Sequence, residues 1–294
     1  MTLRHLEIFV EVAECGKMSE AAKKMYIAQS SVSQAILEIE RQYNIRLFER
    51  YSKKLYLTEA GEEMLRYAQN ITELYNTMDQ QMRYNNRTVR IRVGATMTIG
   101  ACLIGDILKE FNARHSNVNV TVMVRNTPNL ERRLMSSELD IALVEGRTKE
   151  RELVSRKFFT DHLSLVVGRE HPFYQRDSIE ISELEDQPFI FRETGSGTRI
   201  MTEEFLARHG VKVREVWMCN NSEAIKNAVI NNYGISLLSE LLVKRECREG
   251  LMHKLPIHNV ELTQNYSLVY HKDKFFTNEL TAFTQICEKF QYLR

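Results

Sequence analysis

Apolar residues between residues 21 and 40 recur at the spacing of two short helices. Ala21, Ala22 and Met25 give the first helix a buried side, and a second apolar stripe follows after a tight turn. The second stripe consists of Val32, Ala35, Ile36 and Ile39. The opposite face of that helix, which is predicted to start at about Ser30, carries Ser30, Ser33, Gln34 and Arg41. Hydroxyl, amide and guanidinium groups suit phosphate oxygens and base edges, although an ordinary helical pair fits the periodicity equally well.

The residues before this pair predict a third helix. Leu3, Leu6, Phe9, Val10 and Ala13 share one helical face, and Gly16 is placed to end the helix. Three short helices with a glycine at one corner are typical of a helix-turn-helix module, here at about residues 18–37.

A basic segment follows the second helix of the pair. Residues 41–58 hold five basic residues and one acid, Glu49, which gives a local charge of +4. The basic residues are Arg41, Arg46, Arg50, Lys53 and Lys54. Two short extended runs flank Ser52 to Lys54, so we expect a hairpin, or wing, whose basic side chains neutralise phosphates. A charged run on a solvated surface is the alternative.

Thr58 and the acids after it predict the start of a long helix over residues 59–87. Its apolar positions alternate at spacings of three and four residues, which is the pattern of a two-stranded coiled coil. These positions are Met64, Ala68, Ile71, Tyr75, Met78 and Met82. The narrow seam favours dimerisation over packing against its own domain, and a paired linker would match two half-sites on DNA.

From residue 88 the pattern alternates between strand and helix. We predict strands at 89–94, 118–124 and 140–144, with helices at 99–115 and 130–137. A second block predicts strands at 163–168, 189–191, 215–219, 235–238 and 266–270, with helices at 197–209, 222–232 and 278–290. Strands alternating with helices indicate α/β folding with a parallel sheet.

The length of this segment favours two subdomains. We place subdomain I at 88–161 and 269–294 and subdomain II at 162–268. The predicted fold class is therefore α+β multidomain: an N-terminal winged helix-turn-helix over 1–58, a linker helix, and a C-terminal α/β domain of two subdomains over 88–294.

Several loops of the α/β segment carry small polar residues before a predicted helix, where free backbone amides bind anions. Such loops lie at strand ends, which line the ligand crevice in open α/β sheets. The candidate effector-binding residues are Thr96, Met97, Thr98, Asn126, Thr127, Arg192, Thr194, Gly195, Ser196, Gly197, Thr198 and Asn220. The GSGT sequence could also be a tight turn with a helix cap, and it lacks the spacing and lysine of a P-loop.

Composition narrows the functional classes. Net charge is +1 in 294 residues, so no global basic field indicates a polyanion partner. Five scattered cysteines without zinc spacing fit a reduced cytoplasmic protein, and we expect no metal and no cofactor. The sequence contains neither an 18-residue apolar run nor a signal peptide, so no membrane association is expected. HExxH and GxSxG motifs are absent, which disfavours an enzyme.

The ordered set RHLEIFVEVAE, AAKKMYIAQSSVSQAILEIE and LFER…LTEAG resembles the N-terminal domain of LysR-type transcriptional regulators. The remaining 200 residues, about two thirds of the chain, resemble the periplasmic-binding-protein-like effector domain of that family. One departure is that the family often has proline where Ser30 and Ser31 stand. The stretches ATMTIG, RNT and FRETGSGTR are most similar to the CbbR and CysL branch of the family.

The resemblance implies a regulator that binds promoter DNA and is switched by a small anionic metabolite between the two subdomains. DNA-binding residues are then expected among Ser30, Ser31, Ser33, Gln34, Arg41, Arg50, Lys53 and Lys54. A homodimer or homotetramer and an interaction with RNA polymerase are also implied. Two other hypotheses stay open from the residues: a transport-type ligand-binding domain with an N-terminal oligomerisation segment, and a metabolic enzyme on the C-terminal scaffold.

Overall fold

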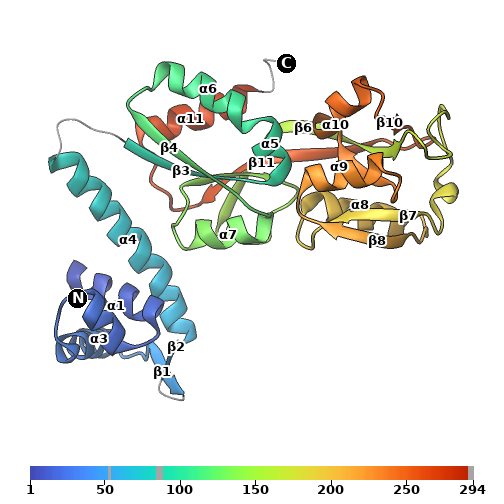
Figure 1. Cartoon of the computed structure of the whole chain (residues 1–294). Coiled ribbons are helices and arrows are strands. Elements are labelled where there is room, and N and C mark those ends of the chain that lie inside the picture. Colours follow the sequence, from blue (N-terminus) through green and yellow to red (C-terminus); the bar gives the residue numbers. More distant parts are fainter. Residues whose placement is uncertain (52–53, 84–88, 291–294) are drawn as a thin grey trace. The chain divides into compact units, whose positions relative to one another are not determined.

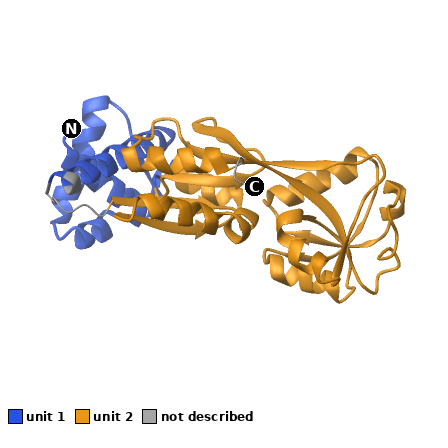
Figure 2. Ribbon diagram, turned by 90° about the horizontal axis from the view of Figure 1, so that it is seen from above, with its two compact units in different colours: residues 1–87, 135–137 blue, residues 88–134, 138–294 orange. Residues whose placement is uncertain are grey.

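The chain forms two compact units in the computed structural model, which describes residues 1–51, 54–83 and 89–290. Unit 1 comprises residues 1–87 and 135–137, and unit 2 comprises residues 88–134 and 138–294. Figure 2 colours the two units. The predicted boundary between linker helix and α/β domain, at residues 87–88, lies outside the described residues.

Unit 1 is a bundle of short helices with a small hairpin (Figure 1). Its elements are α1 (Leu3–Cys15), α2 (Met18–Lys24), α3 (Gln29–Tyr43), β1 (Phe48–Tyr51), β2 (Lys54–Leu57) and the long α4 (Glu59–Arg83). The apolar stripes of the first three helices converge on one core, in which Phe9, Val12, Val32 and Ile39 are fully buried. Burial of these stripes removes apolar surface from water and holds the helices together.

Local signals explain where these elements begin and end. Gly16 ends α1 in the left-handed conformation, with φ of 65°, and its amide donates to the Val12 carbonyl. Helix α3 begins at Gln29 with Ala28 as its N-cap, one residue before the start predicted at about Ser30. Thr58 caps α4, because its hydroxyl accepts from the Gly61 amide at 3.0 Å.

The predicted apolar seam of α4 has two parts with different surroundings. Ala68 is fully buried in the unit 1 core and Met64 packs against that core, so these two positions serve their own unit. The rest of the seam is apolar and exposed by 42–72%: Ile71, Tyr75, Met78 and Met82, together with Leu74. The exposed stripe, defined here by these five residues, follows the i, i+3, i+4 spacing of one helical face.

Unit 2 is built around a seven-stranded mixed sheet. Strands β3 (Val89–Ala95), β4 (Val118–Val124) and β5 (Ile141–Glu145) are parallel, whereas β6 (Leu153–Gly168), β9 (Ser236–Ser239), β10 (Met252–Leu255) and β11 (Leu262–His271) add antiparallel pairings. The parallel sheet predicted from the first block is confirmed for β3, β4 and β5, and the antiparallel strands extend it. The strand order is β10-β6-β11-β5-β3-β4, and β9 also pairs with β6.

Unit 2 consists of two halves, which differ in the helices that cover the sheet. Around β3, β4 and β5 lie α5 (Met97–Cys102), α6 (Ile104–Arg114), α7 (Thr127–Met135) and α11 (Asn278–Lys289). The other half contains the short helix η1 (Ile181–Leu184), α8 (Gly197–Arg208), α9 (Ser222–Ile230), α10 (Glu240–Arg248) and the parallel pair β7 (Pro188–Arg192) and β8 (Arg214–Cys219). Each half has its own apolar core, and the long strands β6 and β11 run through both halves.

Several predicted boundaries in unit 2 are corrected. The helix predicted at 99–115 is two helices, because the backbone leaves helical geometry at Leu103. Helix α7 begins at Thr127 and not at residue 130, and β6 begins ten residues before the predicted 163. Helix α10 and strand β10 had no prediction at all.

A buried ion-pair network closes one end of the sheet in unit 2. The Asp140 carboxylate accepts from the Arg92 amide at 2.6 Å and from Nη2 of Arg92 at 2.8 Å, and it pairs with Nζ of Lys274 at 2.6 Å. Burial alone would raise the pKa of Asp140, but Lys274 and Arg92 hold it below its ordinary value. In the described part of the chain, no helix is long and apolar enough to cross a membrane.

Candidate functional site

The outer face of α3 carries polar side chains that project into solvent. Ser30, Ser31, Ser33 and Gln34 are all exposed, while the opposite face of α3 is buried in the unit 1 core. The Gln34 amide donates to Oε1 of Glu38 at 2.8 Å, so its carbonyl oxygen stays available. This face therefore presents short hydroxyl groups and an amide to a partner.

The hairpin β1–β2 lies next along the chain and is basic. Arg50 on β1 and Lys54 on β2 are exposed, as is Arg41 in the last turn of α3. Tyr51 pairs with Lys54 in the antiparallel register of β1 and β2. Lys53, a predicted phosphate contact, lies outside the described residues.

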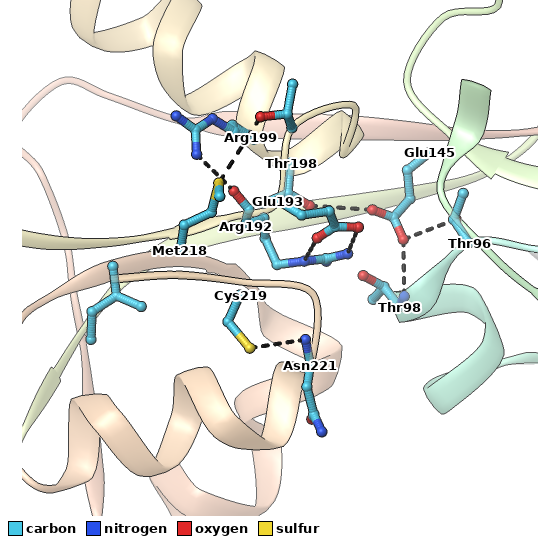
Figure 3. A network of polar contacts seen from close by, with 12 residues as sticks. Thr96, Thr98, Glu145, Arg192, Glu193, Thr198, Arg199, Met218, Cys219 and Asn221 are labelled. Atoms are coloured by element: carbon cyan, nitrogen blue, oxygen red, sulfur yellow. Dashed lines mark hydrogen bonds and ion pairs between the residues drawn. The ribbon is translucent and has the colours of Figure 1, made fainter. Parts of the chain in front are cut away.

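A second polar site lies in unit 2, where Glu145 ends β5. Its carboxylate is buried and accepts three hydrogen bonds (Figure 3). The Thr96 hydroxyl and the Thr98 amide both donate to Oε1 at 3.0 Å, and the Thr198 hydroxyl donates to Oε2 at 3.2 Å. Thr96 and Thr98 lie around the start of α5, whereas Thr198 lies on α8, so one carboxylate joins the two halves of unit 2.

The backbone also brings these two halves into close contact. A Cβ at Gly197 would lie 2.7 Å from the Glu145 carbonyl oxygen and 3.0 Å from Nε2 of Gln264. No side chain fits there, so glycine lets the first turn of α8 approach β5 directly. The Thr127 hydroxyl donates to the same Glu145 carbonyl at 3.3 Å.

Arg192, at the end of β7, supplies a buried positive charge beside this contact. Its side chain is only 3% exposed and forms a two-bond pair with Glu193, through Nε at 2.9 Å and Nη2 at 3.2 Å. The third nitrogen, Nη1, has no hydrogen-bond partner in the described structure. A buried donor without a partner is costly, so it indicates a place for a ligand or a water molecule.

Arg192 is one of five residues in this region that have a buried polar side-chain atom without a hydrogen-bond partner among the described residues. Among the described residues, six buried side-chain atoms here lack a hydrogen-bond partner: Thr98 Oγ1, Arg192 Nη1, Ser196 Oγ, Ser222 Oγ, and both Oε1 and Nε2 of Gln264. They come from the start of α5, the end of β7, the starts of α8 and α9, and β11. We call these five residues, together with Glu145, the polar cluster.

A second buried carboxyl lies on β6, which β11 separates from β5. Burial raises the pKa of Asp161, and its carboxylate accepts from the Tyr266 hydroxyl at 2.5 Å. Burial, with the negative charges of Glu145 and Asp161, also raises the pKa of Tyr266. The tyrosine therefore stays protonated and donates.

The structure brings many of the predicted effector residues together. Buried residues are Thr96, Thr98, Thr127, Arg192, Ser196 and Thr198; Met97, Asn126, Gly195 and Gly197 are half-buried. Thr194 and Asn220 are instead exposed. Asn126 accepts from the Asn129 amide at 3.3 Å within the first turn of α7, and Asn221, not Asn220, caps α9. The prediction that all of these residues bind effector stays a prediction.

Comparison with known proteins identifies the molecule. Residues 3–62 match the bacterial regulatory helix-turn-helix protein of the lysR family, and residues 85–291 match the LysR substrate binding domain. The chain belongs to the LysR family. Two relatives among curated proteins are CysL of Bacillus subtilis, 28% identical over 90% of this chain and 89% of its own, and CmpR of Synechocystis, 28% identical over 93% and 90%.

Two solved structures share the fold of this chain. A full-length variant of OxyR from Pseudomonas aeruginosa covers all of this chain and 95% of its own, with a TM-score of 0.72 at 19% identity. The CcmR regulatory domain of Synechocystis, solved in complex with 2-PG, matches 69% of this chain and 98% of its own, with a TM-score of 0.65 at 26% identity.

As a LysR-family member, the chain is a DNA-binding transcriptional regulator with an effector-binding domain. The family consists of regulators and not enzymes, so the enzyme hypothesis is set aside, as is the reading of the N-terminal segment as only an oligomerisation module. The resemblance to the CysL and CbbR branch is confirmed by the relatives found.

Sequence reasoning missed Glu145 and Gln264 in this LysR-type domain, whereas Ser222 ends the loop of residues 220–222, which the sequence indicates as a fourth candidate loop. Glu145 could have been found, because it directly follows the strand predicted at 140–144, as Thr96 and Asn126 follow theirs. Gln264 lies more than one hundred residues further along the chain, and no local pattern distinguishes it.

Proposed function

We propose that a small anionic effector binds at the polar cluster, between the two halves of unit 2, and that its binding switches transcription from a promoter. The observation that carries the proposal is the set of unpartnered polar atoms in the cluster, above all Nη1 of Arg192. Hydroxyl and guanidinium groups can all donate, so a carboxylate, phosphate or sulfate group satisfies several of them at once.

Glu145 determines which part of the cluster this anion uses. The Thr96 hydroxyl, the Thr98 amide and the Thr198 hydroxyl already donate to it. An incoming anion therefore uses the donors that have no partner among the described residues, which include Nη1 of Arg192 and the hydroxyls of Ser196 and Ser222. The CcmR regulatory domain, with its bound 2-PG, supports a small-molecule ligand for this class of domain.

The same arrangement suggests how binding acts on the protein. The polar cluster contains residues from both halves of unit 2. A ligand with hydrogen bonds to both halves therefore favours the arrangement in which the two halves lie at the matching distance from each other. The effector shifts this equilibrium only as far as its affinity differs between the two states. A change in closure then alters how subunits of a homodimer or homotetramer are arranged on DNA and how they meet RNA polymerase.

For DNA recognition, we propose that α3 enters the major groove. Ser33 and Gln34 would lie closest to base edges, with Ser30 and Ser31 at the groove edge. The basic side chains after them, Arg41, Arg50, Lys53 and Lys54, would contact the phosphate backbone. The exposed stripe of α4 would pair with the same stripe of a second copy.

Ser196 offers a direct test of the effector site. Its hydroxyl has no partner in the described structure, so Ser196→Ala removes no internal hydrogen bond. We expect at least one of sulfate, phosphate, glycolate and 2-PG to raise the melting temperature of the full-length protein. One lost bond to a charged ligand should weaken its titrated affinity about ten-fold in the variant.

Ser116→Ala serves as the matched control, because Ser116 is exposed in the loop between α6 and β4. This control should bind the anion as the unmodified protein does. The proposal fails if no anion shifts the melting temperature, or if both serine variants lose affinity equally.

A further inference from the structure

A pocket outside the polar cluster lies where α5, α9 and α10 meet. Its volume is about 320 Å³, which is within the range of small-molecule sites. Ala101 and Cys102 line it from α5, and Leu241 and Leu242 form an apolar part on α10. Neither the effector proposal nor the DNA-binding surface uses this pocket.

The pocket contains a buried carboxylate with one unused oxygen. Glu246 is 3% exposed, and its Oε1 accepts from Nζ of Lys226 at 2.8 Å and from Nη2 of Arg245 at 2.9 Å. Its Oε2 is buried and has no hydrogen-bond partner among the described residues. An ionised carboxylate can only accept, so this oxygen requires a donor such as a hydroxyl group.

The charge of Glu246 is secured by its neighbours. Burial alone would raise its pKa, but the bonds from Lys226 and Arg245 hold the pKa below its ordinary value. The Lys226 ammonium is itself buried, and it also pairs with Glu223 at 2.6 Å. This ion-pair group therefore holds a charged carboxylate in the wall of the pocket, since Glu246 is one of its lining residues.

The rim of the pocket is positively charged. Lys244 and Arg248 lie one helical turn apart on α10, both are exposed, and neither makes an ion pair within the described ranges. Four cationic and two anionic side chains line the pocket, so its net charge is +2. A ligand here should carry a negative charge together with a hydrogen-bond donor.

We propose that this pocket is a second small-molecule site of unit 2, specific for a hydroxylated organic anion. The hydroxyl donates to Oε2 of Glu246, and the anionic group lies against Lys244 and Arg248. Helix α5 connects this site to the polar cluster, since Thr98 lies near its start and Cys102 at its end. A ligand that bridges α5 and α10 therefore contacts both halves of unit 2.

Calorimetric titration of the full-length protein tests the site with three probes. Glycerol 3-phosphate carries both required groups, propyl phosphate lacks the hydroxyls, and inorganic phosphate lacks the carbon body. We expect glycerol 3-phosphate to bind about ten-fold more tightly than propyl phosphate, because one bond to a charged acceptor is lost. In Glu246→Gln this preference should fall several-fold.

Two further variants locate the binding. The double variant Lys244→Ala, Arg248→Ala should bind glycerol 3-phosphate with an affinity that is lower by roughly five-fold or more. The control double variant Arg208→Ala, Lys212→Ala changes two charges outside the pocket and should keep the affinity of the unmodified protein. Ala101→Phe should block the pocket without changing any charge.

Three outcomes overturn the proposal. In the first, no probe binds at millimolar concentration. In the second, all three probes bind equally, which removes the role of the Glu246 oxygen. In the third, Ser196→Ala abolishes glycerol 3-phosphate binding while the Lys244 and Arg248 variant retains it, which places the ligand in the polar cluster. The effector proposal has its own test, at Ser196 and with its own set of anions, and only the third outcome would support it.

Discussion

Glu145→Ala is the change that should most reveal how the two halves of unit 2 are held together. The substitution removes the acceptor of three hydrogen bonds, from the Thr96 hydroxyl, the Thr98 amide and the Thr198 hydroxyl. Each donor is then left in a buried site without its partner, which costs about 1 kcal/mol or more per group. The expected loss in the free energy of unfolding is about 3 kcal/mol, part of it offset because the carboxylate no longer has to be desolvated.

Differential scanning calorimetry of the full-length protein measures this loss. For a unit of about 200 residues, 1 kcal/mol corresponds to roughly 2–4 °C, so the transition of unit 2 should fall by about 6–12 °C. The control is Glu204→Ala on α8, where an exposed glutamate forms a loose ion pair at 3.8 Å with Arg208. That pair is exposed, so its loss should change the transition by about 2 °C or less on the same scale. Equal effects of the two substitutions would refute the role assigned to Glu145.

Three other substitutions test separate parts of the molecule. Gln34→Ala should weaken operator binding about ten-fold and relax the preference for the operator sequence, whereas the control Gln285→Ala should bind as the unmodified protein does. Gel shifts on the operator and on a scrambled duplex measure both effects. An equal loss of affinity on the two duplexes would contradict a contact between Gln34 and the bases. Tyr75→Asp in the exposed stripe should lower the molar mass of the oligomer measured by light scattering, whereas Asn76→Asp, on another face of α4, should not. An unaltered molar mass in Tyr75→Asp would exclude pairing of two copies through α4. Asp140 has a lowered pKa, so its contribution is present at neutral pH and lost as pH falls through that value. Asp140→Asn should therefore lower the free energy of unfolding by about 3 kcal/mol at neutral pH. Between neutral pH and about pH 3, the melting temperature of this variant should fall less than that of the unmodified protein, because the variant has no carboxylate to protonate. Equal falls in the two proteins would disprove the role assigned to Asp140.

Unit 1 could be predicted well because its signals are local. The apolar stripe of α3, the glycine that ends α1 and the threonine that caps α4 each depend on residues within one or two turns. The exposed stripe of α4 was also visible, but not the fact that Met64 and Ala68 belong to the core of unit 1. That division depends on packing against elements distant in sequence, which periodicity does not encode.

Unit 2 was predicted less completely for the same reason. The first half of β6 alternates poorly, since Ser155, Arg156 and Lys157 are all exposed. These residues form a strand because they pair with β11, more than one hundred residues later. Pairing of this kind is non-local, so the strand could not be found from its own pattern. The break at Leu103 likewise depends on packing around α5, and the helical periodicity continues through it.

The predicted effector loops contribute to the contact between the two halves of unit 2, whereas their binding of an effector stays a prediction. Sequence analysis found hydroxyl and amide donors and inferred an anion, yet a carboxylate of the chain itself already uses three of those donors. An added anion near Arg192 therefore meets the negative charge of Glu145. At an effective dielectric constant of about 20, a like charge about 10 Å away costs about 1–2 kcal/mol.

This repulsion gives Glu145 opposite effects on stability and on affinity. Glu145→Gln keeps one acceptor oxygen but removes the charge, so the protein should lose a little stability while its affinity for a simple anion rises roughly ten-fold. Titration of the full-length variant with sulfate and phosphate measures the gain, and Glu204→Gln is the matched control. Weaker anion binding in Glu145→Gln would mean that the effector donates a hydrogen bond to Glu145, so that its anionic group alone does not account for recognition.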